Sequence, residues 1–127
     1  ERMYSGDIFM KIILAEDGNL LIGFGCLYLN HDTEYGALLD NLHVSKSYSG
    51  KGIGTHIIQV FAAEIFNSGK RKDMYLWVLE ENTRAIRLYE KLKGQEKGMA
   101  LETGLGSKQV PKYRYYWPSV DILINDV

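Results

Sequence analysis

The chain has 127 residues, of which 46% are hydrophobic and 24% charged, and this composition indicates one folded domain over residues 1–127 and excludes a disordered chain. The formal net charge of −1 creates no field that would attract nucleic acid or a membrane surface, so any anion has to be held by a local site. The single cysteine, Cys26, excludes an internal disulfide, and its apolar surroundings predict a buried, inert thiol in a cytoplasmic protein.

The first third of the chain carries the pattern of three strands. Residues 9–17 and 20–30 are rich in apolar residues and are separated by a turn at Gly18, which predicts a hairpin. Residues 34–44 form a third strand-like run after a polar turn, and Glu34 is expected to serve only the geometry of that turn.

The hydrophobic period changes in the middle of the chain. From Ile53 to Ile65 apolar residues recur every fourth position, which predicts a helix that buries one face. The segment 67–70 contains Gly69 and is typical of the end of such a helix.

A further strand and a second helix follow. Residues 73–81 are apolar on consecutive positions, as in a central strand, and Asn82 is placed to cap the next helix. The apolar stripe of that helix, which ends at Gly94, consists of Ala85, Leu88, Tyr89 and Leu92. Residues 96–102 and 112–117 are expected to form the last two strands.

The predicted order of elements is β-β-β-α-β-α-β-β. Two strand-helix-strand connections within this order imply a mixed sheet with helices packed on it. The sequence therefore predicts an α+β fold, with a mixed, mostly antiparallel β-sheet flanked by helices.

Three glycines lie within five positions at the start of the first predicted helix, at Gly50, Gly52 and Gly54. Their spacing fits neither a nucleotide-binding P-loop nor a dinucleotide fingerprint. Backbone N–H groups at a helix N-terminus can nevertheless hold a phosphate, and glycines let it approach closely. From the residues alone, a phosphate site and a tight structural turn both remain open.

Two motifs at this spacing resemble those of the GNAT superfamily of acyl-CoA-dependent N-acyltransferases. The glycine loop aligns with the phosphate motif of the family, although Ser49 stands where the family has Arg or Gln. The second helix has the frame N-x-x-A-x-x-x-Y at Asn82, Ala85 and Tyr89. The resemblance covers about residues 9–116.

The resemblance implies a GNAT-like fold and an acetyl-CoA-dependent N-acetyltransferase. The N-terminal strand and helices that usually precede the hairpin in this family are expected to be missing or reduced to residues 1–9. The coenzyme would lie on the strand before the loop, on the loop, and on the second helix, at Leu42, His43, Val44, Ser49, Gly50, Lys51, Gly52, Ile53, Gly54, Thr55 and Asn82. No metal site is expected.

The same resemblance names two candidate catalytic residues. Tyr89 would act as the general acid that protonates the departing thiolate, since a phenol is neutral at pH 7. Asp40 is the candidate general base, and His43 or a water molecule are its alternatives. Leu38 occupies a position where some relatives carry a catalytic glutamate. Simple strand alternation would put Asp40 on the same face as Leu42 and on the face opposite His43.

Two other interpretations remain at this point. One is a module that binds acyl-CoA without turnover, and the other is an unrelated α+β protein with a structural glycine turn. For the enzyme, the acceptor would be a small amine or a peptide, with neither nucleic acid nor a membrane as partner. The resemblance also allows a homodimer through terminal strands.

Overall fold

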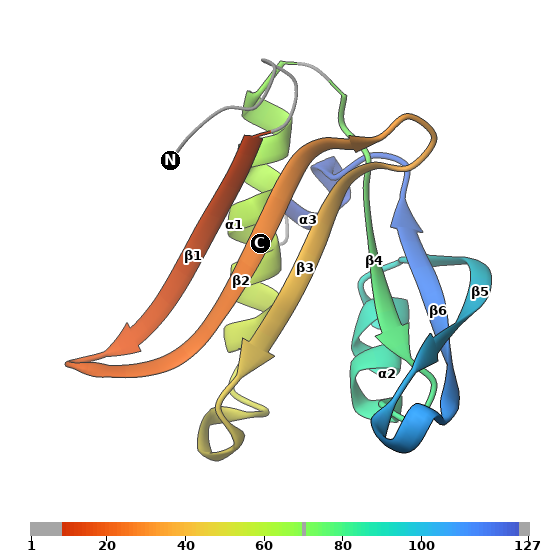
Figure 1. Ribbon diagram of the computed structural model, residues 1–127. Coiled ribbons are helices and arrows are strands. Elements are labelled where there is room, and N and C mark those ends of the chain that lie inside the picture. The colour runs from red at the N-terminus through yellow and green to blue at the C-terminus, as the bar shows by residue number, and fades with distance from the viewer. Residues whose placement is uncertain (1–8, 70, 125–127) are drawn as a thin grey trace.

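The computed structural model describes residues 9–69 and 71–124. Six strands in this part of the chain form one sheet in the order β1-β2-β3-β4-β6-β5 (Figure 1). Their bounds are β1 Phe9–Asp17, β2 Leu20–Asp32, β3 Gly36–Val44, β4 Met74–Leu79, β5 Gln95–Thr103 and β6 Gln109–Trp117. Only β3 and β4 pair in parallel, and every other neighbouring pair is antiparallel. The predicted mixed, mostly antiparallel sheet is therefore confirmed.

The described helices are α1 (Ile53–Asn67), α2 (Thr83–Lys91) and α3 (Asp121–Ile124), together with two short 3-10 turns. α1 and α2 match the predicted helices, whereas the four-residue α3 has no signal in the sequence pattern. The second strand-helix-strand connection runs from β4 through α2 to β5, and these two strands are not neighbours because β6 lies between them. None of these helices is long and apolar enough to cross a membrane.

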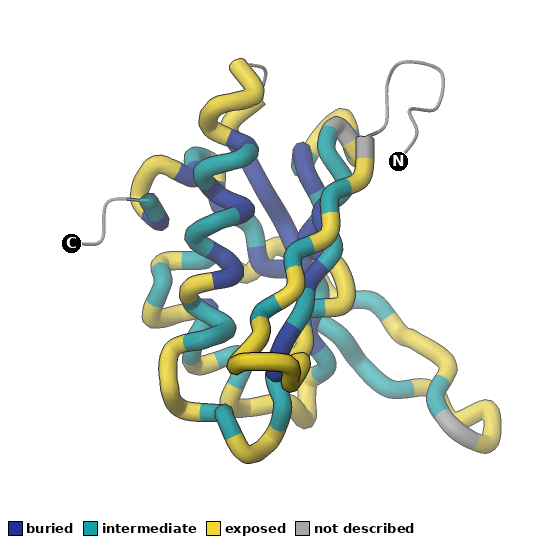
Figure 2. Tube along the Cα trace, turned by 90° about the vertical axis from the view of Figure 1, so that its left-hand side faces the viewer, coloured by how far each residue is buried: buried dark blue, intermediate teal, exposed yellow. Residues whose placement is uncertain are grey.

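One hydrophobic core joins the helices to the sheet. Buried residues follow the side of α1 that faces the strands (Figure 2), as its apolar period predicts. Phe61 and Trp117 are fully buried, and the Trp117 indole Nε1 donates a hydrogen bond to the carbonyl of Leu92 at 3.0 Å. This bond links the end of α2 to β6. Residues of α1 and of α2 belong to the same core cluster, and the two helices therefore pack on one face of the sheet.

The parallel pair β3 and β4 is bonded at one end and separates at the other. Its register contains only Ala37 opposite Met74 and Leu38 opposite Tyr75. Beyond these positions the two strands diverge toward the start of α1 and toward α2 (Figure 1). We call the part of β3 that pairs with β4, from Gly36 to Leu38, the closed end. The rest of β3, from Leu39 to Val44, has no partner on the β4 side, and we call it the open end.

A β-bulge interrupts β3 at the open end. Cys26 pairs with Asp40 and Phe24 with His43, so two residues of β3 stand opposite one residue of β2. Asn41 adopts a left-handed φ of 57° at this point. The bulge reverses the alternation, and the expectation that Asp40 shares a face with Leu42 was therefore wrong. Asp40 lies with His43 on the face that α1 does not cover.

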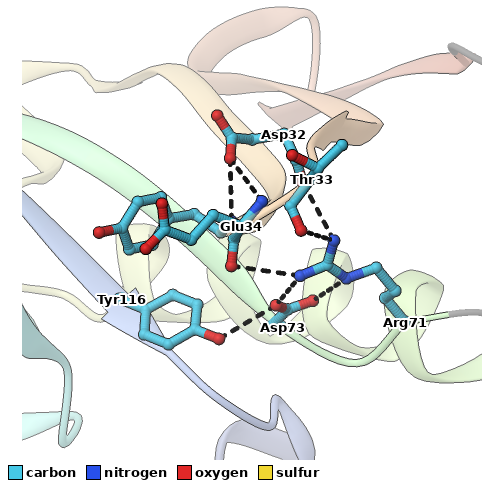
Figure 3. Close-up of polar contacts among 7 residues, drawn as sticks. Asp32, Thr33, Glu34, Arg71, Asp73 and Tyr116 are labelled. Atoms are coloured by element: carbon cyan, nitrogen blue, oxygen red, sulfur yellow. Dashed lines mark hydrogen bonds and ion pairs between the residues drawn. The ribbon is translucent and has the colours of Figure 1, made fainter.

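A polar network fastens the closed end (Figure 3). Arg71, in the connection between α1 and β4, donates hydrogen bonds to the carbonyls of Asp32, Thr33 and Glu34 in the β2–β3 turn. The same guanidinium binds both carboxylate oxygens of Asp73, at 3.1 and 2.6 Å. One side chain thus links the segments that precede β3 and β4.

Asp73 is the buried centre of this network. Its side chain is 8% exposed and also accepts a hydrogen bond from the Tyr116 hydroxyl at 3.0 Å. Gly36 approaches it so closely that a Cβ there would lie 2.3 Å from Oδ1 of Asp73. The closed end is therefore packed around a carboxylate that has all its partners in place.

Candidate functional site

A groove of about 490 Å³ lies at the open end, between the glycine loop, the first turn of α1, and α2. It is lined by Leu42, Val44, Tyr48, Ser49, Gly50, Gly52, Ile53, Gly54, Thr55, Asn82, Arg84, Ala85, Leu88, Tyr89 and Lys91. Segments more than thirty residues apart in sequence thus meet in one hollow.

The glycine loop leaves the N-terminus of α1 open to a ligand. Gly50 and Gly52 both have a φ of 83°, a left-handed conformation that favours glycine. Gly52 is the N-cap of α1 and has no side chain that could accept a hydrogen bond. The first backbone N–H groups of the helix are therefore not bonded by a capping side chain. A Cβ on Gly52 would meet nothing within 4 Å, and it would occupy space that belongs to the groove.

The charges around the groove favour an anion. Neither α1 nor α2 has an acidic residue in its first turn, where acidic residues would otherwise offset the positive end of the helix dipole. Both N-termini line the same hollow. A phosphate group would meet backbone donors and no carboxylate on these two turns.

α2 begins where the sequence predicted. The Oδ1 atom of Asn82 accepts a hydrogen bond from the backbone N–H of Ala85 at 3.2 Å, which confirms Asn82 as the N-cap. This cap fixes the start of a helix whose next turns carry Leu88 and Tyr89 to the groove.

Tyr89 presents a protonated phenol to the groove. The side chain is 7% exposed and packs its ring against Tyr115 and Trp117, with centroids 6.2 and 6.1 Å away. Burial raises the pKa of Tyr89 to about 12, so it stays neutral throughout the physiological range. The structure gives its hydroxyl no hydrogen-bond partner among the described residues.

The β3 wall of the groove offers backbone as well as side chains. Leu42 and Val44 line the hollow, and past Leu38 the strand has no ladder partner on the β4 side. An unpaired strand edge can bond an extended ligand in the way that it would bond another strand.

Three of the sequence-predicted residues lie away from the groove. The His43 side chain contacts the Phe24 ring on the other face and lines a separate hollow with Lys46. Lys51 is exposed and does not line the groove. Asp40 is exposed on the uncovered face, where its carboxylate accepts a hydrogen bond from the backbone N–H of Asn41 at 3.0 Å.

Sequence reasoning missed Arg84 and Tyr48. Arg84, on the first turn of α2, reaches the glycine loop and donates a 3.4 Å hydrogen bond to the Ser49 hydroxyl. Tyr48 donates to the carboxylate of Asp17 at 2.6 Å and lines the groove beside Ser49. No periodicity pairs residues 35 positions apart. An arginine in the first turn of a helix is nevertheless a local anomaly, since cations are disfavoured there, and it could have marked the residue.

The uncovered face of the sheet carries an aromatic cluster that begins at the closed end, where Tyr35 precedes β3 and Tyr75 pairs with Leu38. The guanidinium of Arg114 lies 4.1 Å from the centroid of the Tyr35 ring and 4.5 Å from that of the Trp77 ring. The ring of Tyr75 contacts that of Tyr35 in a tilted arrangement, with centroids 5.8 Å apart. Cys26, expected to be buried, is half-exposed on this face. Within residues 9–69 and 71–124 no group of three or more His, Cys, Asp or Glu residues is placed to hold a metal ion.

Comparison with known proteins assigns the family. The model of the acetyltransferase (GNAT) family matches residues 4–94, and the chain belongs to this family. The match contains every residue that lines the groove, from Leu42 to Lys91. The resemblance drawn from the motifs is confirmed.

The chain also matches curated proteins and solved structures. It is 36% identical over 81 residues to a mouse thialysine N-epsilon-acetyltransferase (62% of this chain, 47% of that protein). It is 31% identical over 83 residues to the spermine/spermidine N(1)-acetyltransferase of Bacillus subtilis strain 168 (61% and 55%). It thus spans about half the length of the curated relatives it matches.

One solved structure shows the same fold with a ligand. A protein of Salmonella typhimurium, solved with its cofactor acetyl-CoA, superposes with a TM-score of 0.70 at 16% identity, covering 87% of this chain and 64% of that chain. This likeness supports the fold of the present chain.

Proposed function

We propose that the protein transfers an acetyl group from acetyl-CoA to a primary amine. The observation that carries the proposal is the groove itself. Its hollow joins an uncapped helix N-terminus, an unpaired strand edge and a buried neutral tyrosine at the open end of a split parallel pair. Family membership and relatives named as N-acetyltransferases support it.

The residues present fit acetyl-CoA. The N–H groups from Gly52 to Thr55 would hold the pyrophosphate, because they lie in the first turn of α1, which contains no acidic residue. The pantetheine arm is amide-bearing and extended, and the unpaired edge at Leu42 and Val44 offers it strand-like hydrogen bonds. His43, between Leu42 and Val44, would contribute its backbone groups to the same edge. Asn82 lines the groove and would contact the coenzyme from the start of α2.

When bound, the coenzyme supplies an acetyl group activated as a thioester. The amine nitrogen forms a bond to the acetyl carbon, the carbon–sulfur bond breaks, and the sulfur leaves with its electron pair. Tyr89, protonated and at the groove, donates its proton to that sulfur, and the resulting phenolate regains a proton from water before the next turnover. Because burial keeps this phenol neutral, it is available as a donor at every physiological pH.

The proton on the amine leaves on the other side of the sheet. Asp40 lies on the face opposite the groove, at the edge of the split between β3 and β4. An amine approaching from that face would meet Asp40, directly or through water, while Tyr89 acts from the helix face. The bulge at Asn41 thus separates the candidate base from the candidate acid across the reacting bond.

The acceptor is proposed to be a small amine or an amine-bearing peptide. The relatives that the chain matches are named for thialysine and for spermine or spermidine, all of which carry primary amines. We also propose that two copies of the protein form a homodimer through their terminal strands, as the resemblance to the family allows.

Free thiol release tests the function directly. Purified protein is mixed with acetyl-CoA and a panel of polyamines, lysine analogues and short peptides, and thiol formation is followed with a disulfide reagent. The account expects amine-dependent release with at least one acceptor. Tight binding of acetyl-CoA with no release on any amine would instead support the acyl-CoA-binding module.

A further inference from the structure

We infer that Arg84 binds the pyrophosphate of the coenzyme and acts as the side-chain cation of the glycine loop. The inference rests on the proposed function, since it names a residue for the same ligand. The loop has no arginine of its own, and Ser49 stands at its first position. The cation comes instead from α2, across the groove.

The contacts place the guanidinium against the loop. Nη1 of Arg84 lies 3.4 Å from the Ser49 hydroxyl. Nη2 would lie 3.1 Å from a Cβ on Gly50, so the absence of a side chain at that glycine makes room for the arginine. Arg84 and the loop therefore form one wall of the groove together.

The charge of Arg84 is available for a ligand. No carboxylate lies within ion-pair distance of it among the described residues. Arg84 stands on the first turn of α2, where a cation opposes the helix dipole, so its placement costs stability in the absence of a ligand. A pyrophosphate at the loop would offset that cost, because the planar guanidinium can bond two phosphate oxygens at once.

The α1 N-terminus supplies the second half of this site. The backbone N–H groups at Gly52 and beyond face the groove that Arg84 borders. One wall thus gives backbone donors and the other a charged fork. This arrangement assigns Arg84 to the group that the loop would hold, the pyrophosphate, rather than to the 3′-phosphate on the adenosine.

Binding calorimetry with CoA and with dephospho-CoA tests the assignment. Dephospho-CoA keeps the pyrophosphate and lacks the 3′-phosphate. R84Q should weaken the binding of both ligands about tenfold, the effect of losing one charge-assisted bidentate contact. R84K, which keeps the charge and loses the fork, should fall between R84Q and the parent.

The control is R87Q, which removes an exposed arginine from the same helix one turn later, outside the groove. It should bind both ligands as the parent does. An R84Q variant that matches R87Q would overturn the inference, as would a loss confined to CoA, which would assign Arg84 to the 3′-phosphate. If the parent binds neither ligand, the proposed function fails together with the inference.

Discussion

The two ends of the β3–β4 pair differ in how their polar groups are bonded: those of the closed end have partners within the protein, whereas those of the open end are available to a ligand. At the closed end, Asp73 is buried with Arg71 and Tyr116 as partners, and Gly36 leaves no room for a side chain. At the open end the backbone of β3 past Leu38 has no partner strand on the β4 side, and the helix that starts there lacks a side-chain cap.

Stability and binding therefore depend on different ends of one strand pair, with the stabilising contacts at the closed end and the groove at the open end. Unmade backbone hydrogen bonds cost free energy, so a strand edge stays open only if other contacts hold the pair together. Arg71, which reaches three carbonyls of the β2–β3 turn, supplies such contacts at the closed end.

Gly52→Asp should reduce CoA affinity by more than about 100-fold and leave the protein folded. A carboxylate at this position places a negative charge in the groove at the helix N-terminus, where the pyrophosphate is expected. Gly52→Asn is the matched control, since asparagine has the same shape, no charge, and tolerance for the left-handed φ of 83°. Calorimetry that finds equal affinities for the two variants would remove the charge argument.

Tyr89→Phe should lower kcat by about 100-fold while KM for acetyl-CoA changes little, because the hydroxyl is needed as the thiolate departs. Phenylalanine keeps the ring contacts with Tyr115 and Trp117. Steady-state kinetics on the best amine provides the measurement.

Tyr115→Phe is the control for Tyr89→Phe. Tyr115 belongs to the same ring cluster, but its hydroxyl donates to Glu90 at 2.8 Å and does not line the groove. The variant should lose some stability and keep kcat. If Tyr89→Phe retains the parental kcat, Tyr89 is a core residue and the proton comes from water.

Asp73→Ala should lower the free energy of unfolding by about 2–3 kcal/mol, since it removes the buried acceptor of Arg71 and Tyr116. The CoA affinity of the folded protein should change less than about threefold, because Asp73 lies at the closed end and the groove lies at the open end. Glu34→Ala is the control, because Arg71 uses the carbonyl of Glu34 and not its side chain. Urea unfolding and calorimetry on the same samples measure both quantities, and a parental midpoint for Asp73→Ala would contradict the role of the network.

The smallest expected effect concerns acid stability at the closed end. The backbone N–H groups of Glu34 and Tyr35 donate to the Asp32 carboxylate and hold its pKa below its ordinary value of 3.8. A depressed pKa means that this stabilisation is present above pH 3.8 and is lost as the pH falls through the folded-state pKa.

Asp32→Asn should therefore cost less than about 1 kcal/mol at pH 7 and nothing near pH 2, because asparagine keeps the acceptor and loses the charge. Chemical unfolding at the two pH values gives the comparison. A difference from the parent that persists at the lower pH would show that shape, and not charge, matters at this turn.

Local patterns in the sequence predicted much of this molecule. The stripe of α2 and its Asn82 cap depend on residues within one or two turns, and both are confirmed. Alternation in β6 likewise sends Tyr115 and Trp117 into the core and Tyr116 to the other face.

The remaining features depend on contacts between distant segments. The bulge at Asn41 interrupts an otherwise regular alternation, and although asparagine tolerates the left-handed φ found there, that tolerance alone does not predict a bulge at this position. The bond between Arg84 and Ser49 and the bonds of Arg71 join residues that only the folded sheet brings together. For this reason the groove was predicted in outline, whereas its cation and the face of Asp40 were not.

Amide hydrogen exchange with and without CoA tests the separation of the two ends most directly. CoA should slow exchange in peptides that cover Leu42–Thr55 and the first turns of α2, where the unpaired edge and the helix N-terminus would gain partners. Peptides that cover the β2–β3 turn and Arg71–Tyr75 should exchange at unchanged rates. Protection that is absent at the open end, or that appears equally at both ends, would contradict the account.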